Sequence, residues 1–310
     1  MRFPVIKSLL TASVLAALAA TPAWAADKVK IGFVSTLSGP SAALGVDIRD
    51  AFMLAVKLNG GKLGGLPADV SISDDQFKPD VGKQLFERYV KRDKVDFLTG
   101  VVFSNIMLAG LPEAVNGKTI YLSPNAAPSP IAGAQCTPYF FAVSWPNDAY
   151  HEAAGLNKDT RLIQPGFGAD QDVIRAVGND MLGVFDTSHW AMDLPNEANK
   201  KFVAEFEKEY KRLPTLYAAQ GYDTALLIDA AVRAANGKID DKEAMIKTLK
   251  TVKFNSVRGE FRFNTNQYPI QNYYLREIVK DGQGRLVNRI VGQPILTNHG
   301  DAYVKDCPMK

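Results

Sequence analysis

The chain has 310 residues, of which 46% are hydrophobic and 22% are charged, and its formal net charge is +3 at pH 7. This composition is ordinary for a globular protein and argues against a disordered chain. The charge is too small to attract nucleic acid or an anionic membrane, so we expect neither as a partner.

The first 25 residues predict a secretory signal peptide. Arg2 and Lys7 form a cationic start, an apolar run spans 8–20, and Ala23-Trp24-Ala25 supplies the small residues of a cleavage site. The run is shorter than the roughly 20 residues of a membrane span. The alternative is a buried N-terminal helix. We expect cleavage after Ala25, export to the periplasm, and a net charge of about +1 once the two cations are removed.

The first half of the mature chain alternates strands and helices. Apolar runs bounded by turn residues predict strands, and apolar residues spaced three or four apart predict helices. Strands are expected at 29–34, 70–73, 95–102 and 119–123, and helices at 44–58, 80–91 and 105–115. Repeated β-α pairs predict an α/β fold with a doubly wound parallel sheet.

The second half shows a weaker pattern. Strands are expected at 139–144, 161–164, 183–186, 259–263, 272–279 and 285–291, and helices at 172–177, 196–211 and 217–235. Residues 280–284, Lys-Asp-Gly-Gln-Gly, predict a hairpin turn between the last two strands.

Two cysteines, Cys136 and Cys307, are the only ones in the chain. In an oxidising periplasm an isolated pair favours a structural disulfide over a metal or redox site. We expect a bridge that ties the C-terminal tail to the loop before Tyr139; the alternative is two buried free thiols.

Sequence signals for catalysis are weak. His151, His189 and His299 lie far apart, and the chain has no GxSxG, GxxxxGK or GxGxxG motif. The pair Asp74-Asp75 follows a strand where dinucleotide folds keep a ribose ligand, but without the glycine fingerprint a solvated turn is the better interpretation. We therefore expect no enzyme, no metal and no cofactor.

Signals for ligand binding are stronger. In doubly wound folds a ligand lies beyond the carboxyl ends of the strands, and here those ends carry 38–41, 103–105 and 125–129. Ser104 is placed to be an N-cap, which would leave N–H groups of the next helix free for an anion. The alternative is that Ser104 caps only its own helix.

Several motifs resemble the leucine/isoleucine/valine-binding proteins of ABC importers, in family order along nearly the whole mature chain. They are 35–40 with 44–45, 74–76, 100–104, and Tyr-Ala-Ala-Gln-Gly-Tyr-Asp at 217–223. Three stretches, 123–133, 144–148 and 268–273, look closest to the branch that also serves aromatic acids.

The resemblance implies a two-lobed periplasmic-binding-protein fold that closes on its ligand. Lobe 1 would comprise 27–143 and 187–265, and lobe 2 would comprise 144–186 and 266–310. The ligand carboxylate would be held largely by backbone N–H groups. The residues around it would be Phe103, Ser104, Asn125, Ala126, Ala127 and Ser129. Leu44 departs from the family, which often has an aromatic residue there.

A second departure concerns lobe 2. After Ala154-Gly155 the family continues with further strands and helices, whereas this chain passes directly to a later strand. The loss is about two βα units, on the order of 80 residues, so the resemblance implies a truncated second lobe.

The remaining candidates come from this part of the chain and from its junction with lobe 1. Phe167 and Asp170 are candidates from lobe 2, with Asp170 able to meet an ammonium group; Trp190 and Tyr222 lie near the crossings between lobes. For each of them packing is the alternative.

The function implied is a monomeric receptor that passes a small carboxylate to permease subunits. The ligand would be a branched-chain or hydrophobic amino acid or an aromatic acid, and the aromatic residues near the cleft favour the aromatic acid. The alternative is a non-transporting remnant or a sensory single-lobe module.

Overall fold

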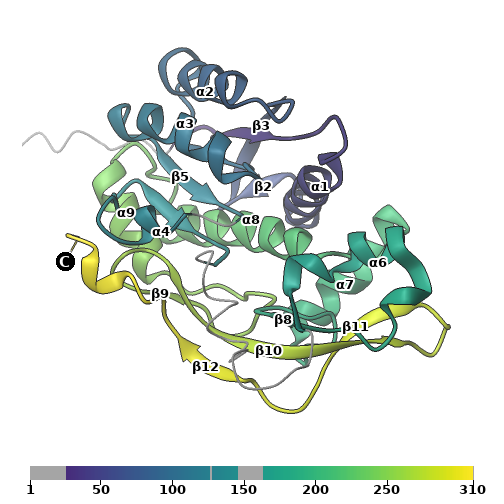
Figure 1. The fold of residues 1–310 in the computed structure, drawn as a ribbon. Helices are drawn as coiled ribbons and strands as arrows, with labels where there is room; N and C mark the ends of the chain where they lie inside the picture. The colour runs from purple at the N-terminus through teal and green to yellow at the C-terminus, as the bar shows by residue number, and fades with distance from the viewer. Residues whose placement is uncertain (1–25, 126–127, 146–162, 310) are drawn as a thin grey trace, which may run out of the picture.

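The computed structural model describes residues 26–125, 128–145 and 163–309 (Figure 1). The expected signal peptide, the candidates Ala126 and Ala127, and the Ala154-Gly155 junction lie outside the described residues.

An N-terminal sheet forms the first half of the molecule, with the strand order β2-β3-β1-β4-β5-β6. The strands are β1 (Val29–Ser35), β2 (Lys62–Leu63), β3 (Leu66–Asp74), β4 (Phe97–Thr99), β5 (Ile120–Ser123) and β6 (Phe140–Ala142). Only β2 runs antiparallel to its neighbour; the other pairs are parallel. The parallel sheet expected from the first half of the sequence is confirmed.

Helices cover both faces of this sheet (Figure 1). On one face α1 (Ala42–Leu58), α8 (Leu216–Ala234) and α9 (Lys242–Thr251) share a core with Ile31 and Phe33. On the other face α2 (Pro79–Glu87), its π-helical extension Arg88–Asp93, and α3 (Ser104–Asn116) pack on Leu98 and Tyr121. Alternating inward residues along each strand thus build two cores.

A C-terminal sheet has the order β11-β10-β8-β7. Its strands are β7 (Ile163–Pro165), β8 (Phe185–Ser188), β10 (Pro269–Lys280) and β11 (Leu286–Ile290); β9 (Arg262–Phe263) and β12 (Leu296–His299) also pair with β10. Within the described ranges only β7 and β8 pair in parallel, whereas β10 is antiparallel to each partner. The C-terminal sheet is therefore mixed, in contrast to the mainly parallel N-terminal sheet.

Shorter elements complete both halves. The helix α6 (Gln171–Val177) follows β7 through the 3₁₀ turn Gly166–Gly168, and a second 3₁₀ turn spans Gly178–Met181. The helix α7 (Glu197–Tyr210) precedes α8, and its Phe202 and Phe206 belong with α1 and α8 to the core of the N-terminal half. The four-residue α4 (Ser129–Ala132) follows β5, and a 3₁₀ turn, Val304–Asp306, lies at the C-terminus. Among the described helices none has the length and hydropathy of a membrane span.

The two halves are joined by a continuous core and by a disulfide. Trp145, Trp190 and Tyr273 belong to the same apolar cluster as α1 and α8, and α8 crosses the middle of the molecule (Figure 1). Cys136 and Cys307 form a disulfide with a Cα–Cα distance of 5.6 Å, so the expected bridge to the C-terminal tail is confirmed.

Candidate functional site

The loop between β4 and α3 is held tightly at the carboxyl edge of the N-terminal sheet. Gly100 has a φ of +103°, and a Cβ atom there would lie 2.6 Å from the Val34 carbonyl oxygen, so only glycine fits. The Ser35 hydroxyl donates to the Gly100 carbonyl at 2.8 Å. The start of α3 is therefore fixed by the backbone rather than free to move.

The first turn of α3 is open. Phe103, with φ −101° and ψ 135°, occupies the N-cap position and provides no side-chain cap, and Ser104 is the first helical residue. The expectation that Ser104 is the N-cap is wrong by one residue because Phe103 already has the extended backbone that an N-cap takes. N–H groups of the first turn have no partner within the helix, and the helix dipole favours an anion beside them.

Asn125 ties the loop after β5 to this helix start. Its Nδ2 donates to the Val102 carbonyl oxygen, and its own carbonyl oxygen accepts from the Ser123 hydroxyl at 2.9 Å and from the Ser144 hydroxyl. Its Oδ1 is buried and has no hydrogen-bond partner among the described residues. The structure thus brings Asn125 beside the loop that carries Phe103 and Ser104. The candidate Ser129 is the first residue of α4.

The Phe103 ring contacts the segment that follows β3. It packs edge-on against Phe77, with 4.5 Å between the ring centroids. Phe77 is 48% exposed and has a positive φ of 60°, held by a hydrogen bond of 2.9 Å from its N–H to the Asp75 carboxylate. Asp75 is fully buried and also accepts from Thr36. The expected solvated turn at Asp74-Asp75 is therefore wrong for Asp75, whereas Asp74 is half-buried.

Asp170 lies elsewhere, at the N-cap position of α6. Its Oδ2 accepts a hydrogen bond of 2.6 Å from the Leu216 N–H, and its Oδ1 lies 3.9 Å from Nη1 of Arg276. Desolvation raises the pKa of the Asp170 carboxyl to about 7, against the opposing attraction of Arg276. Both oxygens face protein groups, and a contact with a ligand ammonium stays a prediction.

The two aromatic candidates near the junction of the halves are buried. Trp190 donates from Nε1 to Asn199 Oδ1 at 2.7 Å, and Tyr222 packs on Phe202 with 4.7 Å between ring centroids. Tyr222 also lines a pocket of about 730 Å³ between α7 and α8 that contains none of the other candidates. These contacts agree with the packing alternative. Phe167, by contrast, is 44% exposed.

Sequence reasoning missed a buried charged network in the C-terminal sheet. Arg276 is 1% exposed and donates from Nε to Asp186 Oδ1 at 2.6 Å and from Nη1 to the Trp190 carbonyl at 2.9 Å. Asn288 donates to the other oxygen of Asp186 at 2.6 Å. The signal that could have found it is the position of Arg276 in β10, where the residues that alternate with it face the core.

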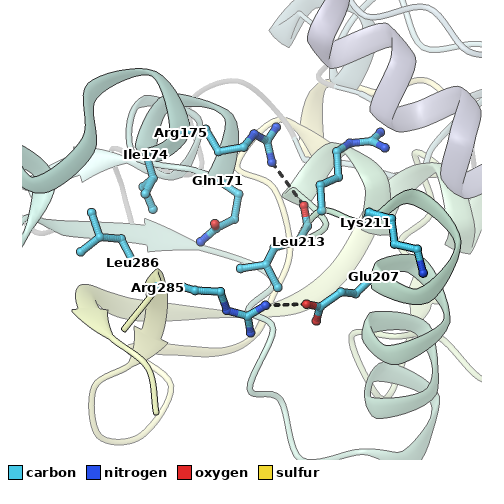
Figure 2. Close-up of a pocket in the computed structure, with 9 residues that line it drawn as sticks. Gln171, Ile174, Arg175, Glu207, Lys211, Leu213, Arg285 and Leu286 are labelled. Carbon is cyan, nitrogen blue, oxygen red and sulfur yellow. Dashed lines mark hydrogen bonds and ion pairs between the residues drawn. The ribbon is translucent and has the colours of Figure 1, made fainter. Parts of the chain in front are cut away.

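A pocket of about 360 Å³ lies where the two halves meet, between α6, the end of α7 and β11 (Figure 2). It is lined by Gln171, Ile174, Arg175, Glu207, Lys211, Arg212, Leu213, Arg285 and Leu286. None of the residues expected to hold the carboxylate lines it. In the described ranges no group of three His, Cys, Asp or Glu residues could hold a metal ion.

Comparisons with known proteins place this geometry in a family. The model of the periplasmic binding protein family matches residues 28–154 and 147–283. A curated relative, Leu/Ile/Val-binding protein homolog 6 of Brucella abortus, is 24% identical over 375 aligned positions that cover 91% of this chain and 95% of the relative.

Solved structures agree in fold. A solute-binding protein of an ABC transporter from R. palustris, in complex with benzoate, is 25% identical with a TM-score of 0.81 and covers 91% of this chain and 100% of its own. A second R. palustris protein, in complex with 4-hydroxybenzoate, is 20% identical with a TM-score of 0.78 and covers 89% and 99%. LivJ of Streptococcus pneumoniae, in complex with isoleucine, is 16% identical with a TM-score of 0.70 and covers 85% and 99%. Because the family model matches most of this chain, the chain belongs to the periplasmic binding protein family.

Proposed function

We propose that this protein is the solute-binding component of an ABC importer, which captures a small carboxylate between its lobes and delivers it to the membrane permease. The observation that carries the proposal is the open first turn of α3 beside the braced Asn125 loop. A carboxylate removed from water needs several charge-assisted donors to offset its desolvation. A helix start without a side-chain cap supplies such donors at a fixed position.

The ligand class is an aromatic or branched-chain carboxylate, with the aromatic acid favoured. One similar structure is in complex with benzoate and another with isoleucine, so the relatives support both kinds of ligand. On this chain, Phe103 directly precedes Ser104 and packs on Phe77, so the two rings offer apolar surface near the proposed carboxylate site.

The second lobe is proposed to be shorter than in the relatives. The alignment with the Brucella protein has 375 positions, whereas 91% of this 310-residue chain is only about 282 residues. The family model also matches as two segments that meet at 147–154. Both findings support a missing block near Ala154-Gly155. The alternative of a non-transporting remnant is tested by the ligand titration described below.

The proposal also sets a location and partners. A periplasmic receptor would be exported by the expected signal peptide, act as a monomer and dock on permease subunits. The Cys136–Cys307 disulfide supports an oxidising compartment.

Calorimetric titration with benzoate, 4-hydroxybenzoate and leucine tests the proposal, and Ser104→Pro probes the site. Proline is tolerated as the first residue of a helix, and the extended backbone of Phe103 suits a residue before proline. The change therefore removes one N–H donor while leaving the helix in place.

We expect Ser104→Pro to weaken binding about 10-fold or more, as for loss of a hydrogen bond to a charged group. Ser104→Ala keeps the N–H and should lose less. Glu197→Pro, at the first residue of α7, is the matched control and should bind normally. No heat with any of the three ligands would contradict the transport function and favour the remnant.

A further inference from the structure

Three polar contacts join the α6 and β11 side of the C-terminal sheet to residues 207–216. Arg175 donates from Nη1 to the Leu213 carbonyl at 3.3 Å, and Arg285 pairs with Glu207, on opposite sides of the pocket in Figure 2. The third is the 2.6 Å hydrogen bond from the Leu216 N–H to Asp170 Oδ2. We call these three contacts the interlobe bridges.

The Asp170 bridge differs from the other two in burial. The side chains of Arg175 and Arg285 are 40% and 36% exposed, so their contacts are screened by water and contribute little. Asp170 is 1% exposed. Leu216 is the first residue of α8, and its N–H has no acceptor within the helix. Asp170 therefore supplies the partner for a buried donor that would otherwise be unsatisfied.

The bridge also connects two separate packing units. Asp170 begins α6, which packs in a small core with Ile278 of β10. Leu216 begins α8, which packs on α1 over the N-terminal sheet. A change in the relative position of the two sheets must break or strain this hydrogen bond.

We propose that Asp170 is a positioning residue whose carboxyl group holds the C-terminal sheet on the first turn of α8, in the arrangement of lobes that captures the ligand. The part of this inference that concerns ligand capture rests on the proposed function, whereas the hydrogen bond between Asp170 and Leu216 does not. Asp170 thus acts through the placement of the lobes rather than by contact with an ammonium group.

Charged and titratable groups face Asp170 from every neighbouring element. Arg276 on β10 attracts its carboxylate, whereas Asp186 on β8 and Asp172 on α6 repel it. Asp172 in turn faces Asp47 of α1 and Arg175. Tyr217 on α8 has its pKa raised by burial and by both Asp172 and Asp170, so it stays neutral at ordinary pH.

The direction of the pH dependence follows from these neighbours. Burial raises the pKa of Asp170 to about 7 in the bridged arrangement, whereas a solvated aspartate titrates near 3.9. The bridged arrangement therefore binds a proton that separated lobes do not bind between about pH 4 and 7. Low pH favours the bridged arrangement. Its stability relative to separated lobes falls as the pH rises toward and through 7. A protonated carboxyl group still accepts the Leu216 hydrogen bond through its carbonyl oxygen.

Amide exchange at Leu216 tests the bridge without any ligand. Wild type should exchange about tenfold or more slowly than Asp170→Ala at pH 6, because Asp170 accepts that N–H and no other described residue does. Asp170→Asn keeps an acceptor and should retain the protection. Amides inside α8, such as that of Leu227, should be unchanged in all three proteins and report that the helix remains folded. Equal exchange at Leu216 in wild type and Asp170→Ala would overturn the inference.

Calorimetry with benzoate, which stays ionised over this range, tests the capture of ligand. The Kd of wild type should rise about fivefold or more from pH 6 to pH 8. Asp170→Asn should bind with a Kd that does not depend on pH, and Asp170→Ala should bind weakly at both values. His189 stays neutral throughout because burial lowers its pKa. Identical pH profiles for wild type and Asp170→Asn would overturn the inference. Protection at Leu216 with no binding of benzoate, 4-hydroxybenzoate or leucine by wild type would overturn the proposed function and leave the bridge standing.

Discussion

Asp223→Ala should destabilise the protein strongly, because Asp223 is the centre of a buried ion pair on α8. Its carboxylate is fully buried and accepts from the Ser256 hydroxyl at 2.6 Å, the Val257 N–H at 2.9 Å and Arg258 Nε at 2.9 Å. Arg258 is itself 7% exposed as a residue and cannot turn to solvent without unpacking. Alanine would leave a buried guanidinium without its counter-charge and a backbone N–H without an acceptor.

The expected loss is about 3–5 kcal/mol of unfolding free energy, the range for removing one partner of a buried ion pair. Urea unfolding followed by circular dichroism measures it as a lower midpoint at unchanged slope. Lys208→Ala is the matched control, because Lys208 pairs with Glu205 at 3.3 Å on the exposed face of α7 and its loss should cost at most about 1 kcal/mol. A loss below about 1 kcal/mol for Asp223→Ala as well would refute the reasoning.

Three further changes test other parts of the fold. Gly221→Ala places a Cβ atom 2.3 Å from the Ile48 carbonyl oxygen and should force α8 away from α1, at a cost of about 1–3 kcal/mol in unfolding free energy. Its control is Gly282→Ala, where the Cβ atom meets open space, and this change should be nearly neutral in the same urea assay. Reduction of Cys136–Cys307 opens a loop with a sequence separation of 171 and should lower stability by about 2–5 kcal/mol; an unchanged midpoint in reductant would contradict this. The pKa of Asp170 is raised to about 7 in the folded protein, so its contribution to stability should decline from about pH 4 to pH 7. The stability of Asp170→Asn relative to wild type should therefore increase across that range. A constant difference in stability between the two proteins would count against the pKa shift.

Most of the N-terminal sheet could be predicted, because β1, β3 and β4 contain short apolar runs and each is followed by a helix. The two-residue strand β2 (Lys62–Leu63) was not expected. The strands of the C-terminal sheet were also expected close to where they lie, but their pairing could not be predicted. The long strand β10 pairs with β8, about 90 residues earlier in the chain, and antiparallel pairing of that kind leaves no local pattern. The β10–β11 hairpin is the exception. Its turn at 280–284 has local glycine and aspartate signals, and Asp281 does bond across it to Arg285. The helix α9 was missed although it begins after an aspartate cap, Asp241.

The candidate site was predictable to a similar degree. Turn residues after β4 and β5 mark the carboxyl edge of the sheet, so Ser104 and Asn125 could be found from the sequence. The N-cap could not be placed to the residue, because a helix boundary depends on the backbone angles of Phe103. The alternation along β10 marks Arg276 as facing the core, but its partner Asp186 could not be identified from the sequence, since the pair forms only when β10 and β8 align.

Thermal unfolding with benzoate and with benzamide tests the central claim, that a carboxylate is captured at the start of α3. A ligand that binds only the native state adds about 2.7 kcal/mol of stability at 100 times its Kd. Benzoate should raise the Tm with increasing concentration, and uncharged benzamide of the same shape should not. An equal shift with both compounds, or no shift with benzoate, 4-hydroxybenzoate or leucine, would contradict the account.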